Sequence, residues 1–127
     1  MTLKTTCNEN IIRYSYTDLV HQKDPSLSSH YITLINNPEN DIYISMASFY
    51  EIAIKMKIDK LEIKTNLSRF YEDTIDDLIT ILPISERYLS AYQSIPLLEE
   101  HRDPFDRLII ATAFADNLNV ITADSKF

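Results

Sequence analysis

The sequence predicts an α/β fold in which a mostly parallel sheet carries helices on both faces. Short β-prone runs alternate along the chain with segments whose apolar residues recur at helical spacing, and this alternation is typical of repeated β-α-β units. The length of 127 residues, with 45% hydrophobic residues, suits one compact domain. We therefore expect a single domain over residues 11–127, preceded by a disordered polar segment at residues 1–10.

In the first half of the chain, two serines stand where helices are expected to begin, because a hydroxyl there accepts a hydrogen bond from a free backbone N–H group. They are Ser28 and Ser45. The expected elements are, in order, a strand over 11–16, a helix over 28–35, a strand over 41–44 and a helix from Ser45 to about Lys57.

In the second half, a weak extended piece at 61–64 precedes a helix capped by Asn66, a buried strand over 79–84 and a helix from Ser85 that Pro96 ends. A further helix begins after Asp103, and the last strand covers 119–122. The side chains expected to face the core from the two middle helices are Leu67, Phe70, Tyr71, Ile75, Leu78, Tyr88, Leu89 and Tyr92.

Composition excludes several classes of protein. Glycine is absent, so Walker-type and dinucleotide-binding glycine loops are excluded, and left-handed backbone positions fall to Asn and Asp in the stretches 36–38, 40–41 and 116–119. The net charge of -7 argues against a broad basic surface for nucleic acid. It does not exclude a nuclease, because a bound divalent ion reverses the local field.

The same sequence indicates a cytoplasmic protein without a membrane partner. The longest apolar-leaning stretch, 108–115, is far shorter than the roughly 20 residues that a membrane crossing needs, and the amino terminus has no apolar signal region. Cys7 is the single cysteine and cannot form an internal disulfide.

Four acids are candidates for a site, and each also has a structural interpretation. Glu51 lies among apolar residues about one helical turn after a strand, where a salt bridge to Lys55 is the alternative. Asp103 precedes a proline and fits a helix N-cap, with Asp106 at the third helical position. Asp124 follows the last strand, where an ordinary turn residue is the alternative.

The combination of these acids points to metal-dependent phosphodiester chemistry. Such chemistry needs several carboxylates, delivered by different elements to one point, to hold a cation that polarises a phosphoryl oxygen and acidifies water. One carboxylate can also position or deprotonate the attacking water.

Several segments together resemble the PIN-domain family, and they are most similar to the toxin ribonucleases of VapBC-type toxin–antitoxin pairs. The segments are IYIS at 42–45, YEIAIK at 50–55, HRDPFDRLIIATA at 101–113 and VITAD at 120–124, with Phe127. The sequences DPSLS at 24–28 and KL at 60–61 match the same subfamily.

The resemblance implies a three-layer α/β/α sandwich and an endoribonuclease that uses Mg²⁺ or Mn²⁺ and is held inactive by a cognate antitoxin. It also implies a homodimer, and an antitoxin that lays a basic side chain into the acidic pocket. In the family, acids corresponding to Glu51, Asp106 and Asp124 line the metal site, with Asp103 at a position near it.

One departure from the family motif supports an alternative function. The family normally has an aspartate ligand in its first strand, where this chain has Arg13; a guanidinium cannot bind Mg²⁺. Asp18 is the nearest acid after it. The alternative is a catalytically impaired PIN-like protein that serves only as an antitoxin-binding or dimerisation module. The family's usual last strand is also expected to be missing after Phe127.

Other polar and aromatic residues allow two interpretations each. The basic stretch of Lys55, Lys57, Lys60, Lys64 and Arg69 could contact an RNA backbone or form a solvated helix face. The eight tyrosines could stack bases or fill the core and interfaces. His101 could carry a proton near the acids or anchor its loop.

Overall fold

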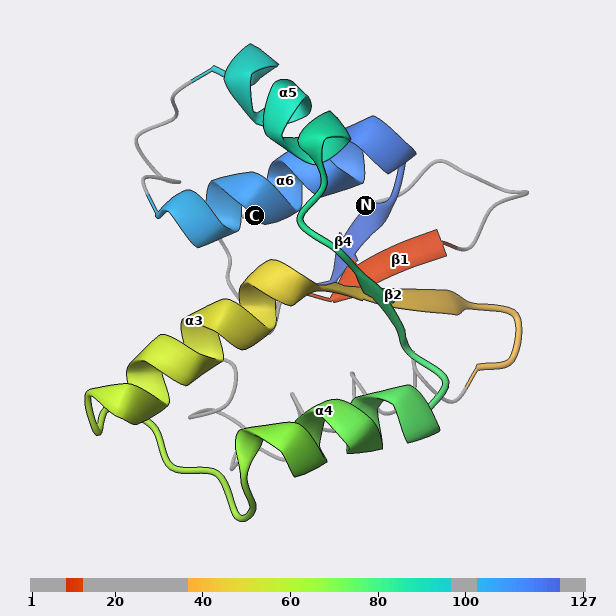
Figure 1. Cartoon of the computed structure of the whole chain (residues 1–127). Helices are drawn as coiled ribbons and strands as arrows, with labels where there is room; N and C mark the ends of the chain where they lie inside the picture. The colour runs from red at the N-terminus through yellow and green to blue at the C-terminus, as the bar shows by residue number, and fades with distance from the viewer. Residues whose placement is uncertain (1–8, 13–36, 97–102, 122–127) are drawn as a thin grey trace.

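The computed structural model describes residues 9–12, 37–96 and 103–121 (Figure 1). In order, the elements are β1 (Glu9–Ile12), β2 (Asp41–Ser45), α3 (Met46–Lys57), α4 (Leu67–Asp76), β3 (Thr80–Leu82), α5 (Glu86–Ser94), α6 (Pro104–Asp116) and β4 (Asn119–Ile121). The expected residues 13–16, the expected helix over 28–35 and Thr122 lie outside these ranges.

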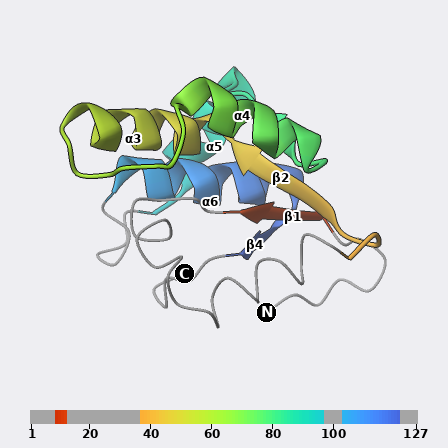
Figure 2. The ribbon, with the colours of Figure 1, turned by 90° about the horizontal axis from the view of Figure 1, so that it is seen from below.

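The four described strands form a parallel sheet, as the sequence predicted, and their order in the sheet is β3-β2-β1-β4. Figure 2 shows β2, β1 and β4 side by side. In the centre of the sheet, Ile11 stands opposite Tyr43 on one side and Val120 on the other. Because all strands run the same way, their carboxyl ends meet at one edge, where α/β folds bind ligands.

Strand β1 begins at Glu9, so the expectation of disorder through residue 10 is wrong for its last two residues. Polar contacts from distant strands explain this start. The Tyr43 hydroxyl donates to Glu9 Oε2 at 2.9 Å, and the Asn119 side-chain amide donates to Asn10 Oδ1 at 3.4 Å. These partners lie far away in sequence, so local periodicity could not reveal them.

Helices cover both faces of the sheet and complete the α/β/α sandwich (Figure 1). On one face, Ile12 and Ile44 form a cluster with Phe49 of α3, against which side chains of α4 pack; the Phe49 and Tyr71 rings meet edge to face at 5.3 Å. On the other face, Ile11 packs with Ile109 of α6. Because successive side chains of a strand point to opposite faces of the sheet, the same strands contribute residues to both cores.

Two helix starts agree with the sequence prediction in detail. Ser45 is the N-cap of α3, and its Oγ accepts from the Ala47 N–H at 3.0 Å. Asn66 is the N-cap of α4, and its Oδ1 accepts from the Arg69 N–H at 2.8 Å. Ser85 precedes α5, but its side chain makes no capping hydrogen bond.

Non-glycine residues take the left-handed conformation at the ends of three helices. They are Asp59, Leu78 and Asn117, with φ of 59°, 63° and 59°. After each, a backbone N–H bonds back to the helix; the Leu118 N–H, for example, donates to the Ala113 carbonyl at 2.8 Å. Asn117 falls in a stretch that the sequence predicted, whereas Leu78 is a residue type that this conformation strains.

Three details of the second half differ from expectation. Ile75 and Leu78 are 48% and 88% exposed instead of facing the core; Leu78 lies outside the helix because α4 ends at Asp76 and the left-handed turn follows. Leu89 is 48% exposed. Strand β3 spans only Thr80–Leu82 and, lying at the end of the described sheet, is partly exposed rather than buried. None of the helices within the described ranges is long and apolar enough to cross a membrane.

Candidate active site

The first candidate acid lies on the helix that leaves the carboxyl end of β2. Helix α3 starts directly after Ser45, the last residue of β2, so its first turns lie at the edge of the sheet where ligand sites form. Glu51 lies in the second turn and is buried, with 5% of its surface exposed. A carboxylate at this depth requires compensation by hydrogen bonds or a cation.

The second and third candidate acids form the start of α6. Asp103 is its N-cap, and Asp103 Oδ1 accepts from the backbone N–H groups of Phe105 at 2.8 Å and Asp106 at 3.3 Å. Pro104 follows at the first helical position, as predicted. Asp103 is exposed, whereas Asp106 is 8% exposed. The carboxylate of Asp106 thus lies at the positive end of the helix dipole.

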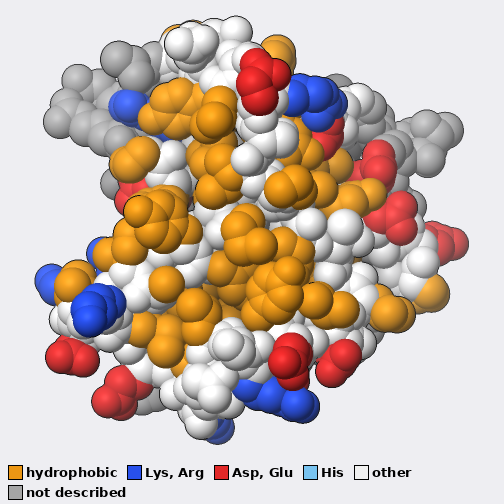
Figure 3. All heavy atoms as spheres, viewed as in Figure 1, with side chains coloured by type: hydrophobic (Ala, Val, Ile, Leu, Met, Phe, Trp, Pro, Cys, Tyr) orange, Lys and Arg blue, Asp and Glu red, His pale blue; other side chains and the backbone are white. Residues whose placement is uncertain are grey.

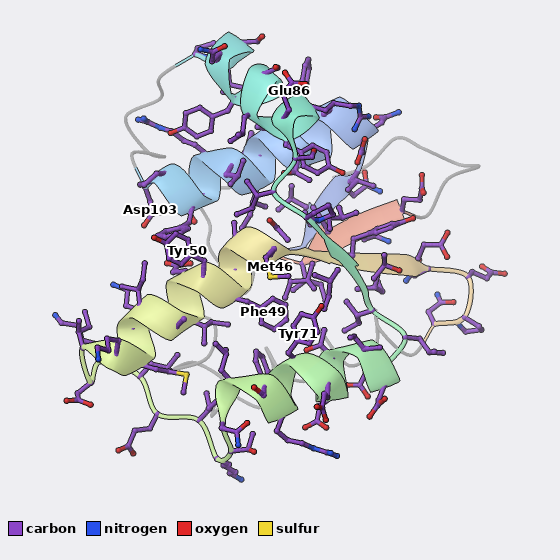
Figure 4. All side chains as sticks on the ribbon, viewed as in Figure 1. Met46, Phe49, Tyr50, Tyr71, Glu86 and Asp103 are labelled. Atoms are coloured by element: carbon purple, nitrogen blue, oxygen red, sulfur yellow. The ribbon has the colours of Figure 1, made fainter. Side chains whose placement is uncertain are left out.

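Helices α3 and α6 contact one another near these acids. The Tyr50 and Phe105 rings meet edge to face, with centroids 5.5 Å apart, and each directly precedes an acid, Glu51 or Asp106. Figure 4 shows Tyr50 of α3 and Asp103 of α6 where the two helices approach. The structure therefore brings together the two segments that carry the buried acids.

A further polar group near Glu51 was not singled out from the sequence. Ser48 lies three residues before Glu51 on α3, a spacing that makes neighbours on a helix. Its side chain is fully buried, and its hydroxyl has no hydrogen-bond partner among the described residues. An unsatisfied buried hydroxyl is costly. The signal in the sequence was a serine one turn before an acid within an apolar run.

Four residues that the sequence connected with the site fall outside the described ranges. They are Arg13, which directly follows β1 in the sequence, Asp18, His101, and Asp124, three residues after the end of β4. Within residues 9–12, 37–96 and 103–121, no group of three or more His, Cys, Asp or Glu side chains could hold a metal ion. The described part contributes two buried carboxylates, whose oxygen atoms suit Mg²⁺ or Mn²⁺.

An apolar groove of about 350 Å³ opens between α3, α5 and the start of α6. In Figure 3, hydrophobic side chains gather over the centre of this face. Its lining has no charged side chain, so the groove holds none of the candidate acids. The lining residues are Ala47, Tyr50, Ile84, Leu89, Tyr92, Pro104, Phe105 and Leu108.

Comparison with known proteins identifies the family of the chain. The PIN domain family model matches residues 19–127, a range that includes Glu51, Asp106 and Asp124 and begins after Arg13. No curated protein matches the chain. Since the matched range covers well over half of the sequence and the parallel three-layer fold agrees with it, the chain belongs to the PIN domain family, which indicates a nuclease-type function.

Proposed function

We propose that this protein is a metal-dependent endoribonuclease, the toxin of a toxin–antitoxin pair, which hydrolyses RNA phosphodiester bonds. The observation that carries the proposal is the pair of buried carboxylates, Glu51 and Asp106, on two helices that contact one another in a PIN domain. The toxin role is supported by the resemblance of the motifs around these acids to VapC-type ribonucleases.

In this proposal Glu51, Asp106 and Asp124 hold Mg²⁺ or Mn²⁺, with Asp103 beside them. The bound ion supplies polarisation of a phosphoryl oxygen and acidification of water. The described part of the chain positions two of these acids. The Asp103 cap holds the backbone of Asp106 at the start of α6, and the buried second turn of α3 holds Glu51. The neighbouring Ser48 hydroxyl offers a further oxygen atom.

Metal titration of thermal stability tests this proposal. A ligand that binds the folded chain raises the melting temperature by an amount set by its concentration relative to Kd. We expect Mg²⁺ or Mn²⁺ to raise it, and to be required for cleavage of single-stranded RNA. No change in melting temperature at millimolar metal, together with no cleavage, contradicts the proposal.

The second candidate function is an impaired PIN-like module that binds an antitoxin or a second copy without cleaving RNA. Arg13 favours it, because a guanidinium stands where the family has its first aspartate ligand and could pair with the remaining carboxylates. The metal titration separates the two functions, since the module predicts no stabilisation by divalent ions.

The proposed partners follow from the same resemblance. The net charge of -7 suits a basic antitoxin segment. For a homodimer, the supporting feature is the apolar groove, around which Tyr50, Ile84 and Leu89 are 59%, 42% and 48% exposed. We place the protein in the cytoplasm as part of the same proposal.

A further inference from the structure

A group of lysines follows the buried acid on α3. Residues 55–64 contain four lysines and two acids, a local net charge of +2 in a chain whose net charge is -7. Lys57 is the last residue of α3, and Lys60 and Lys64 lie in the connection to α4. Figure 3 shows Lys and Arg side chains gathered around the end of α3.

Three of these lysines are available to a ligand. Lys57, Lys60 and Lys64 are exposed, and none of the ion pairs found among the described residues includes them. The nearby Arg69 differs, because it pairs with Asp73 at 3.0 Å and with Glu72 at 3.7 Å. We call the three residues the lysine group.

A purely structural role explains only part of the lysine group. Cations are favourable near the carboxyl end of a helix, which accounts for Lys57 in the last turn of α3. Lys60 and Lys64 lie beyond the helix, after the left-handed Asp59. The Lys60 N–H donates to the Lys55 carbonyl at 2.8 Å, so the backbone holds Lys60 against the helix end. The helix dipole therefore gives no reason for a positive charge at Lys60 or Lys64.

One member of the lysine group, Lys57, lies on the same helix as the buried acid. With a rise of about 1.5 Å per residue, the backbone of Lys57 lies roughly 9 Å along α3 from that of Glu51. A nucleic acid whose phosphate is held near Glu51 and Asp106 therefore comes within reach of Lys57 over a few nucleotides, and Lys60 and Lys64 follow Lys57 closely in the sequence. Lysine ammonium groups contact successive phosphates as point charges, and such contacts position a strand without reading its sequence.

We propose that Lys57, Lys60 and Lys64 bind the backbone phosphates of single-stranded RNA beside the bond that is cleaved. This inference rests on the proposed function, and it adds the path of the substrate away from the acids.

The test compares salt dependence of RNA binding in a chain that cannot cleave. In an Asp106→Asn background with Mg²⁺, fluorescence anisotropy measures binding of a single-stranded RNA at several salt concentrations. Each lost phosphate contact reduces the slope of log K against log salt by about 0.7. We expect Lys57→Gln, Lys60→Gln and Lys64→Gln together to reduce it by about 2. Arg69→Gln, which removes a cation that is already paired, is the matched control and should leave the slope unchanged.

The outcomes separate this inference from the proposed function. If the triple variant keeps the slope and affinity of its background while the wild type cleaves RNA, the lysine group does not bind the RNA, and the proposed nuclease function is unaffected. If the wild type does not cleave but the triple variant loses RNA binding, the nuclease fails and the lysine group is supported. Loss of binding to polyglutamate with RNA binding unchanged shows instead a site for acidic protein, and overturns the inference.

Discussion

Arg87 of α5 forms an ion pair with Asp116, the last residue of α6. The same carboxylate accepts a hydrogen bond from the hydroxyl of the buried Tyr88. The Arg87 guanidinium also donates to the Ala115 carbonyl at 3.0 Å and lies 5.6 Å from the centre of the Tyr88 ring. These contacts join α5 to the carboxyl end of α6, the opposite end from Asp106.

This ion pair predicts a loss of stability in acid. Burial raises the pKa of Asp116. Hydrogen bonds from Arg87 and Tyr88 and the charge of Arg87 lower it by more than burial raises it, so the pKa lies below its ordinary value. Its contribution is therefore present above the unfolded-state pKa of about 3.9 and lost as pH falls through the lower folded-state pKa.

Asp116→Asn should lower the free energy of unfolding at neutral pH by about 1 kcal/mol and reduce the loss of stability that the wild type shows in acid. Urea unfolding measured from neutral pH to about pH 2 checks both effects. Asp76→Asn, an exposed acid on α4, is the control and should change neither. Identical pH profiles for wild type and Asp116→Asn would show that the pair contributes nothing.

The end of α4 predicts a stabilising substitution. Leu78 has a φ of 63° and is 88% exposed, so it carries the strain of a left-handed leucine, about 1–2 kcal/mol, and buries little surface. Glycine relieves that strain but adds about 0.5–1 kcal/mol of unfolded-chain entropy. Leu78→Gly should therefore raise the free energy of unfolding by about 0.5–1 kcal/mol, as measured by urea titration.

Asn117→Gly is the matched control for this strain, because asparagine tolerates the left-handed conformation and should gain less. Equal effects of the two substitutions would mean that the side chain of Leu78 is not strained.

The sequence predicted correctly the helix starts that depend on contacts between residues close together in the chain. Ser45, Asn66 and Asp103 cap helices as predicted, because each side chain bonds to an N–H within its own first turn. The left-handed Leu78 could not be foreseen, since no residue rule favours leucine there. For the site, the sequence indicated acids on helices, and α6 begins with the expected cap; the contact between α3 and α6 depends on packing across the fold, which no spacing encodes.

The N-cap of α6 makes a prediction about stability. Asp103→Ala removes the acceptor used by the Phe105 and Asp106 N–H groups and should lower the free energy of unfolding by about 1 kcal/mol. Asp103→Asn should restore most of this loss, because asparagine caps equally well. Because this variant keeps the cap and removes the charge, its rate of RNA cleavage measures the effect of the carboxylate charge alone. Cleavage at the wild-type rate would limit Asp103 to capping, and reduced cleavage would support its place beside the metal.

The apolar groove predicts the position of the homodimer contact. Leu89 lines the groove and is 48% exposed. If a second copy covers this surface, Leu89→Lys introduces a charge into the contact and should convert the dimer to a monomer in sedimentation velocity. Leu78→Lys is the control, since Leu78 is more exposed but lies outside the groove lining. If the wild type is a monomer, or if Leu89→Lys leaves the dimer intact, the groove is not the homodimer contact.

Asp106 carries the sharpest prediction about activity. Asp106→Asn keeps the size of the side chain and the backbone N–H that Asp103 binds, so the melting temperature without metal should stay close to that of the wild type. The substitution removes a charged ligand, and cleavage of RNA should fall by at least the roughly 100-fold typical of losing a catalytic group. Stabilisation by Mg²⁺ should fall with it. If the variant cleaves as fast as the wild type, Asp106 only supports the start of α6, and the metal site must be sought elsewhere.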